Sequence, residues 1–205
     1  MRKEEVEKYI QEFKRENSGL KDLRFKAFES IDEAFPNLSK SDRENLRFKG
    51  AYYPSKQVVI VIANEHKDYT DLNRTLKHEV YGHHGINHLT EEQKKELLQK
   101  IIDSPSNSPI GIFRDNLLKN GYENLKDKPM ILAEETYAHL VEKLPNSKEV
   151  FKGIPEISEI KTGQEIVDVI RSVKNSIQSE ELEHQIIPAR DDLQFKKDIA
   201  LERPK

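Results

Sequence analysis

The sequence contains no cysteine among its 205 residues. Disulfide frameworks, thiolate zinc sites, iron–sulfur clusters and cysteine nucleophiles are therefore excluded, and any bound metal must be held by histidine and carboxylate side chains. Long apolar runs are also absent: nothing approaches the ~18 residues that a membrane span needs, and the mean hydropathy is −0.80. The charged segment 1–8 differs from a signal peptide. We therefore expect a cytoplasmic protein that does not bind membranes.

Glycine is sparse, and neither sign of charge dominates. The eight glycines are scattered, and no phosphate-binding loop, dinucleotide fingerprint or serine nucleophile elbow occurs. With 37 acidic and 34 basic side chains the formal net charge is −3, which argues against specific nucleic-acid binding. No repeat or low-complexity segment occurs, so we expect one domain over residues 1–180 and a charged tail over 181–205. No pattern predicts an oligomeric state.

Hydrophobic periodicity predicts strands early in the chain and helices after them. Apolar residues at helical spacing predict a first helix over 2–16, alternation predicts a strand near 23–28, and a β-hairpin is predicted over 50–62. This order predicts an α+β fold, in which a small N-terminal sheet packs against a predominantly helical layer. The other predicted helices, several of them marked by caps, cover 29–35, 39–46, 71–84, 90–103, 112–120, 129–143 and 163–178.

Histidine is concentrated in one short segment, which holds His78, His83, His84 and His88. The zinc-peptidase motif H-E-x-x-H places two imidazoles four residues apart on one helix face, with the intervening glutamate near the metal-bound water. Here His78 and His83 are five residues apart, which puts them about 140° apart around a regular helix. A single π-helical turn would return them to one face. Gly82 is where we expect this turn, because glycine has no Cβ to obstruct it.

The segment His78-Glu79-Val80-Tyr81-Gly82-His83 resembles the H-E-x-x-G-H motif of the dipeptidyl peptidase III family at all four fixed positions. Together with the predicted hairpin before it, the stretch is still more similar to the small zincin domains carried in large polyvalent proteins of phages and conjugative elements. Both resemblances imply a zincin-like fold with Zn²⁺ as cofactor. In such a site His78 and His83 are metal ligands, and Glu79 acts as general base.

A second segment, 133–139, is expected to supply the third ligand. A catalytic zinc site uses three protein ligands and keeps one position open, so two histidines are too few. The segment resembles the E-E-x-x-A-acid helix of the same family, and that match makes Glu135 the ligand. Ala138 follows at i+3, where a small side chain permits close approach to the Gly82 turn. The family's next acid is replaced here by His139; we expect His139 and Glu134 to be outer partners of the site, with His139 an alternative fourth ligand.

The resemblance implies a zinc-dependent metallopeptidase of gluzincin type, with a peptide or protein as substrate. Zinc-bound water would attack the peptide carbonyl while Glu79 takes up its proton. We expect strand 57–63 to be the sheet edge along which an extended substrate adds.

Two alternatives remain open from the sequence. One is a zinc-stabilised protein-binding module or mobile-element effector without peptidase activity, its metal site closed by His139. The other is a metal-free helical interaction protein, in which Glu79 and His83 are an ordinary i,i+4 surface pair.

Overall fold

The computed structural model describes residues 1–39 and 48–142, and its α+β class confirms the predicted one. The predicted helix 163–178 and the tail 181–205 lie outside the described residues, as does nearly all of 39–46. Short 3₁₀ turns η1 (Ser18–Leu20), η2 (Pro54–Lys56), η3 (Ala63–Glu65) and η5 (Glu123–Leu125) join some of the elements. The main elements, in chain order, are α1 (Lys3–Glu16), β1 (Arg24–Phe28), α2 (Ile31–Ala34), β2 (Gly50–Tyr53), β3 (Val58–Ile62), α4 (Tyr69–Lys77), η4 (His78–His84), α5 (Glu91–Ile102), α6 (Pro109–Lys119) and α7 (Pro129–Glu142).

The three strands form one sheet in the order β1-β3-β2. Strand β3 pairs in parallel with β1 and antiparallel with β2, so it is the central strand. The prediction that strand 57–63 is a sheet edge is therefore wrong. The run Val58–Ile62 is entirely apolar and β-branched, which is typical of a strand with neighbours on both sides. Exposed edge strands usually carry charged side chains, and this run has none. The two edges belong to β1 and β2.

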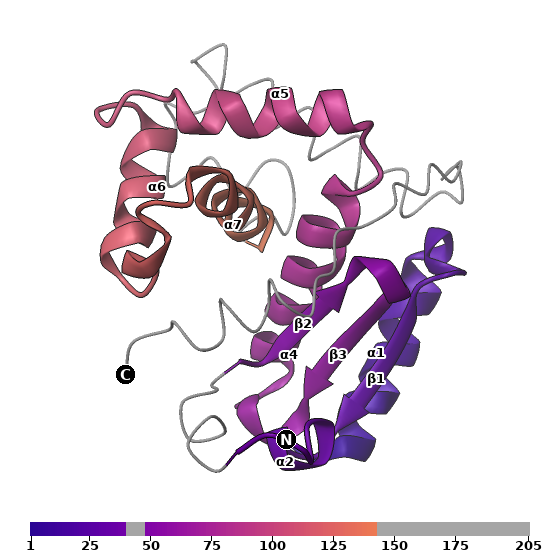
Figure 1. Cartoon of the computed structure of the whole chain (residues 1–205). Helices are drawn as coiled ribbons and strands as arrows, with labels where there is room; N and C mark the ends of the chain where they lie inside the picture. Colours follow the sequence, from indigo (N-terminus) through magenta and orange to yellow (C-terminus); the bar gives the residue numbers. More distant parts are fainter. Residues whose placement is uncertain (40–47, 143–205) are drawn as a thin grey trace.

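One face of the sheet is covered by α1 and α4, which lie behind it in Figure 1. The apolar stripe of α1, with Val6, Ile10 and Phe13, belongs to the same core as Val59 and Val61 of β3. Fully burying side chains of this size contributes about 1.5–3 kcal/mol each to the free energy of unfolding. The sheet is thus a rigid support for α4 and for the turn that continues it.

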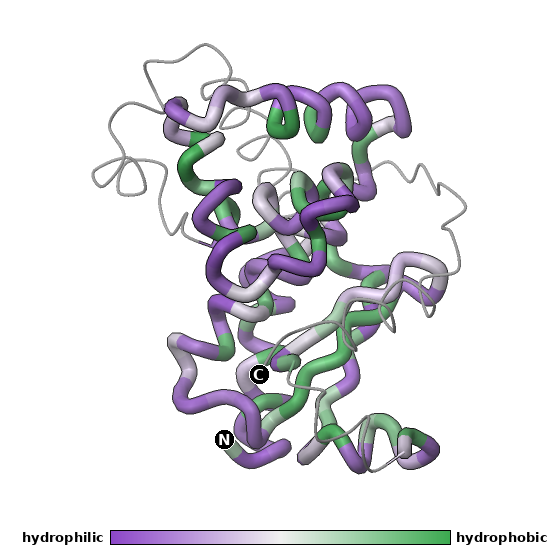
Figure 2. The backbone as a smooth tube through the Cα atoms, turned by 60° about the vertical axis from the view of Figure 1, so that its left-hand side comes forward, coloured by the Kyte–Doolittle hydropathy of each residue, from purple (hydrophilic) through white to green (hydrophobic). Residues whose placement is uncertain are grey.

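Helices α5, α6 and α7 form a layer beyond one end of the sheet (Figure 1). Figure 2 shows α5, across the top, as mostly hydrophilic, in keeping with a helix that buries only Leu97, Leu98 and Ile101. Its predicted N-terminal capping box, formed by Thr90 and Gln93, is present. None of the helices in residues 1–39 and 48–142 combines the length and apolar character needed to cross a membrane.

Candidate metal centre

Helix α4 runs without a break into a π-helical turn, η4, at His78–His84. The widened turn confirms the prediction drawn from the five-residue spacing. It brings the Nε2 atoms of His78 and His83 to 3.2 Å from each other, whereas a regular helix would hold the two rings on different faces. The alternative of an undistorted surface helix is therefore wrong for this segment.

Gly82 lies directly against α7, as the sequence predicted. A Cβ atom at this position would meet Cβ of Ala138 at 2.7 Å and its Cα at 2.9 Å, closer than real Cβ atoms approach other atoms. The small pair Gly82 and Ala138 therefore lets the π-turn and α7 pack backbone to backbone. This close packing holds the histidines of η4 beside the carboxylates of α7.

We expect Gly82→Ala to destabilise the protein by about 1–3 kcal/mol, because the added methyl must push η4 away from α7. In an open helix position the same change stabilises, since alanine has the higher helix propensity. The sign of the change in urea unfolding therefore tests the contact. Asn116→Ala, on the exposed side of α6, is the control and is expected to stay within about 0.5 kcal/mol of wild type. A neutral or stabilising Gly82→Ala would contradict the close packing.

Glu135 of α7 faces both histidines of the turn. Its Oε2 lies 3.5 Å from Nε2 of His78, and its Oε1 lies 3.6 Å from Nε2 of His83. Ligand atoms on a tetrahedral ion with bonds of ~2.0–2.1 Å are about 3.3 Å apart, so these separations suit one ion bound between the three side chains. His78 is 8% exposed and Glu135 5% exposed, whereas His83 is only partly buried, so the centre lies just below the surface. His78, His83 and Glu135 can together hold a metal ion.

A carboxylate from α7 holds the far side of each imidazole. Nδ1 of His78 donates to Oε1 of Glu142 at 2.5 Å, and Nδ1 of His83 donates to Oε1 of Glu134 at 3.1 Å, since an ionised carboxylate can only accept. In a neutral imidazole with its proton on Nδ1, the lone pair is on Nε2. The two Nε2 atoms thus face each other at 3.2 Å, a contact that either a proton on one of them or a metal ion bound by both can satisfy. Carboxylate partners of this kind typically orient metal-binding histidines.

Neighbouring groups of opposite charge stabilise the charged forms of Glu134, Glu142 and His78. Burial alone would raise the pKa of Glu134, but the Nζ atom of Lys94, 3.0 Å from its Oε2, and His83 together lower this pKa to about 2. Burial would likewise raise the pKa of Glu142, but His139 and His78 lower it to about 2. For His78 burial would lower the pKa, but Glu135 and Glu142 raise it to about 10. The two carboxylates therefore favour the protonated form of His78, and a metal ion bound there would compete with that proton.

His139 lies beside the centre, with both of its ring nitrogens engaged. Its Nδ1 is 2.7 Å from Oε1 of Glu142, and its Nε2 is 2.8 Å from the hydroxyl of Tyr122. Its ring also contacts that of His78 edge to face, with centroids 4.7 Å apart. His78, His139 and Glu142 form a second set of potential metal-binding atoms. In the described arrangement, however, Glu142 joins His139 to His78 by hydrogen bonds.

Glu79 is buried next to the centre and belongs to neither set of potential ligands. Its Oε2 accepts a hydrogen bond of 2.7 Å from the backbone N–H of Tyr52. Tyr52 is in the edge strand β2, so this carboxylate joins the sheet edge to the turn that carries His78 and His83.

Two residues of the centre were not predicted from the sequence: Glu142 and Lys94. The family's helix has an acid four residues after the ligand, but here the acid is Glu142, seven residues after Glu135. Residues seven apart lie on the same face of a helix, so Glu142 can reach the same site. That periodicity was a usable signal for Glu142. Lys94 had no such signal, because its ion pair with Glu134 depends on how α5 packs against α7.

We expect Glu142→Gln to weaken binding of a divalent metal by about 10–100-fold, the usual cost of losing an outer carboxylate partner. The amide retains the size of the side chain but loses the charge that orients His78. Competition titration against a chromogenic chelator measures the effect. Glu123→Gln, at an exposed position in η5, is the control and should leave metal affinity unchanged. Equal affinity in both variants would remove Glu142 from the centre.

No protein-family model matches this sequence. Searches of curated proteins and of solved structures also return no significant match. The functional argument therefore rests on the geometry of the centre.

Proposed function

We propose that the protein is a zinc-dependent metallopeptidase of gluzincin type. The observation that carries the proposal is the convergence of the Nε2 atoms of His78 and His83 on each other and on the carboxylate of Glu135. Two imidazoles and one carboxylate are the protein ligands of one known class of catalytic zinc site, and the lack of sulfur ligands argues against softer metals such as Cu(I). The H-E-x-x-G-H resemblance supports the same assignment.

The chain's own residues have separate roles in this reaction. His78, His83 and Glu135 hold the ion, and Glu142 and Glu134 keep the two imidazoles in the tautomer that binds it. Zinc bound there supplies a Lewis acid, which lowers the pKa of a water molecule toward ~7 and polarises the peptide carbonyl. Glu79 takes the proton of the attacking water and returns it to the leaving amine.

The sheet edge beside the candidate metal centre is β2, not the central strand β3. Strand β2 packs against η4, and its Tyr52 N–H is bonded to Glu79. A peptide that adds along this edge would carry its backbone past the proposed base. The substrate class of the proposal is therefore a peptide or protein segment bound in extended form.

Metal content and peptide turnover test the proposal together. We expect about one zinc per chain after purification, and cleavage of a mixed peptide library that stops with 1,10-phenanthroline and returns with zinc. A protein that holds zinc but cleaves no peptide would be a zinc-stabilised binding module, the alternative for which the contact between His139 and His78 is the specific observation. A protein that binds no zinc would contradict both.

Zinc removal should also lower the melting temperature, because the ion would join η4 to α7 and binds only the folded chain. At a free zinc concentration about 1,000 times Kd the stabilisation is about 4 kcal/mol, equivalent to about 10 °C for a protein of this size. Differential scanning calorimetry before and after chelation measures the shift. An unchanged melting temperature after verified metal removal would leave only a weak, adventitious site.

A further inference from the structure

The edge of the sheet opposite the candidate metal centre is formed by β1, whose outward backbone groups have no hydrogen-bond partner among residues 1–39 and 48–142. The N–H of Arg24 donates to the carbonyl of Gln57 at 2.9 Å, and the pairing continues in parallel to Phe28 and Ile62. Since successive residues of a strand direct their N–H and C=O groups to opposite sides, those of Phe25 and Ala27 point away from β3. In the part of the chain that the structure describes, no hydrogen bond reaches these outward groups.

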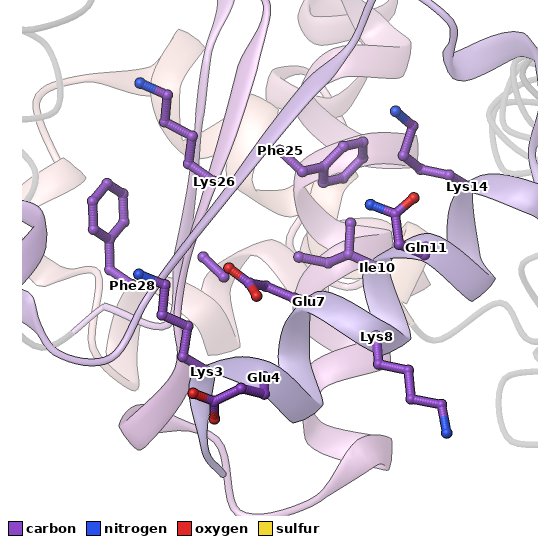
Figure 3. Close-up of a pocket in the computed structure, with 11 residues that line it drawn as sticks. Lys3, Glu4, Glu7, Lys8, Ile10, Gln11, Lys14, Phe25, Lys26 and Phe28 are labelled. Atoms are coloured by element: carbon purple, nitrogen blue, oxygen red, sulfur yellow. The ribbon is translucent and has the colours of Figure 1, made fainter.

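A groove of about 780 Å³ lies along this edge, between β1 and α1 (Figure 3). Its volume falls in the range of ~300–1,000 Å³ common for ligand sites. The rings of Phe25 and Phe28 supply apolar surface, and an ammonium group lies over each: Lys14 at 5.8 Å and Lys3 at 6.0 Å from the ring centroids. The groove thus combines unused strand hydrogen bonds, aromatic surface and positive charge.

The charge of the groove favours an anionic occupant. Four lysines line it against two glutamates, Glu4 and Glu7. Lys3 is already paired with Glu33 at 2.6 Å. Across residues 1–39 and 48–142, no carboxylate lies within ion-pair distance of Lys8, Lys14 or Lys26. Lys14 and Lys26 lie beside the strand edge, and with Lys8 on the outer side of α1 they give the groove a net positive charge (Figure 3).

We propose that this groove is a docking site for an acidic peptide segment in extended conformation, which adds to β1 as a further strand. The outward N–H and C=O groups of Phe25 and Ala27 would pair with its backbone, as in other cases of strand addition. The side chains of the added strand would alternate between the two faces, one row near Phe25 and Lys14 and the other near Lys26 and Phe28. The site is separate from the metal centre, which lies beside β2 at the other edge, and it does not depend on the proposed peptidase activity.

Fluorescence anisotropy with the full-length chain tests the proposal. The probe is a labelled peptide of alternating glutamate and valine, as long as β1, compared with its lysine–valine counterpart. We expect the acidic peptide to bind at least tenfold more tightly. Charge reversal by Lys14→Glu with Lys26→Glu should weaken its binding at least tenfold, whereas Lys95→Glu, at an exposed position in α5, should not. Equal binding of both peptides, or no binding, would overturn the proposal and leave the lysines as protection against edge-to-edge aggregation.

A second measurement separates strand addition from simple charge attraction. Ala27→Pro removes an outward N–H without touching the β1–β3 ladder, and proline is tolerated at such edge positions. It should weaken binding of the acidic peptide at least tenfold with little change in melting temperature. Methylating alternate peptide nitrogens makes the same test without altering the protein: one of the two alternating patterns should abolish binding and the other should preserve it. If both methylated peptides bind as well as the parent, the segment does not add as a strand and the proposal fails.

Discussion

Glu79→Gln is expected to reduce peptide hydrolysis by about 10²–10⁴-fold while zinc content stays near that of wild type. The range is the usual contribution of a positioned general base. Glutamine has the same shape as glutamate, and its side-chain oxygen can still accept the hydrogen bond from the N–H of Tyr52. The anchoring of β2 should therefore survive, and only the ability to take a proton from water is lost.

Single-turnover kinetics, metal analysis and thermal melting of the same preparation measure these quantities. Glu123→Gln is the matched control, since it makes the same chemical change at an exposed position away from the centre. Full activity in Glu79→Gln would show that the carboxylate serves only to hold the edge strand. Loss of zinc together with activity would make Glu79 a ligand, and the proposed ligand set would then be wrong.

The arrangement of η4 against α7 could be predicted because it follows from local rules. The five-residue spacing of His78 and His83 is incompatible with a shared helix face, and the extra residue calls for a π-turn. Gly82 and Ala138 are the smallest residues of their segments, and the structure brings them into contact. Spacing and side-chain size are visible in a single sequence, and they were sufficient to predict the π-turn and its close contact with α7. The choice of Glu135 came instead from the family resemblance, and the structure places this residue beside His78 and His83.

Strand order and the outer partners of the centre were harder to predict because they depend on contacts between distant segments. β1 pairs with β3 in parallel across more than thirty residues, and nothing within either strand identifies that partner. The resulting sheet makes β2 the edge strand beside the centre, whereas the hairpin pattern alone had led us to expect strand 57–63 there. Lys94 reaches Glu134 only because α5 packs on α7. Such pairings are set by the whole core rather than by local periodicity.

Glu135→Ala is expected to lose zinc, and with it all hydrolysis. The two remaining imidazoles make a weak site, and the loss in affinity should exceed the ~10–100-fold that outer partners contribute. Competition titration with a zinc indicator measures the affinity. Zinc should raise the melting temperature of wild type but not of this variant, because the ion can no longer join α7 to η4.

The neighbouring residue supplies the sharpest control, because Glu134 and Glu135 are adjacent acids on one helix with different contacts. Glu134 reaches Nδ1 of His83 and Lys94, whereas Glu135 faces the Nε2 atoms of both histidines. Glu134→Ala should therefore weaken zinc binding but still reach about one equivalent per chain at saturating zinc, which Glu135→Ala should not. If the two variants exchange these behaviours, Glu134 is the ligand. If both keep wild-type affinity, the ion binds elsewhere, and the next pair to test is His84 and His88, whose Nε2 atoms lie 2.9 Å apart.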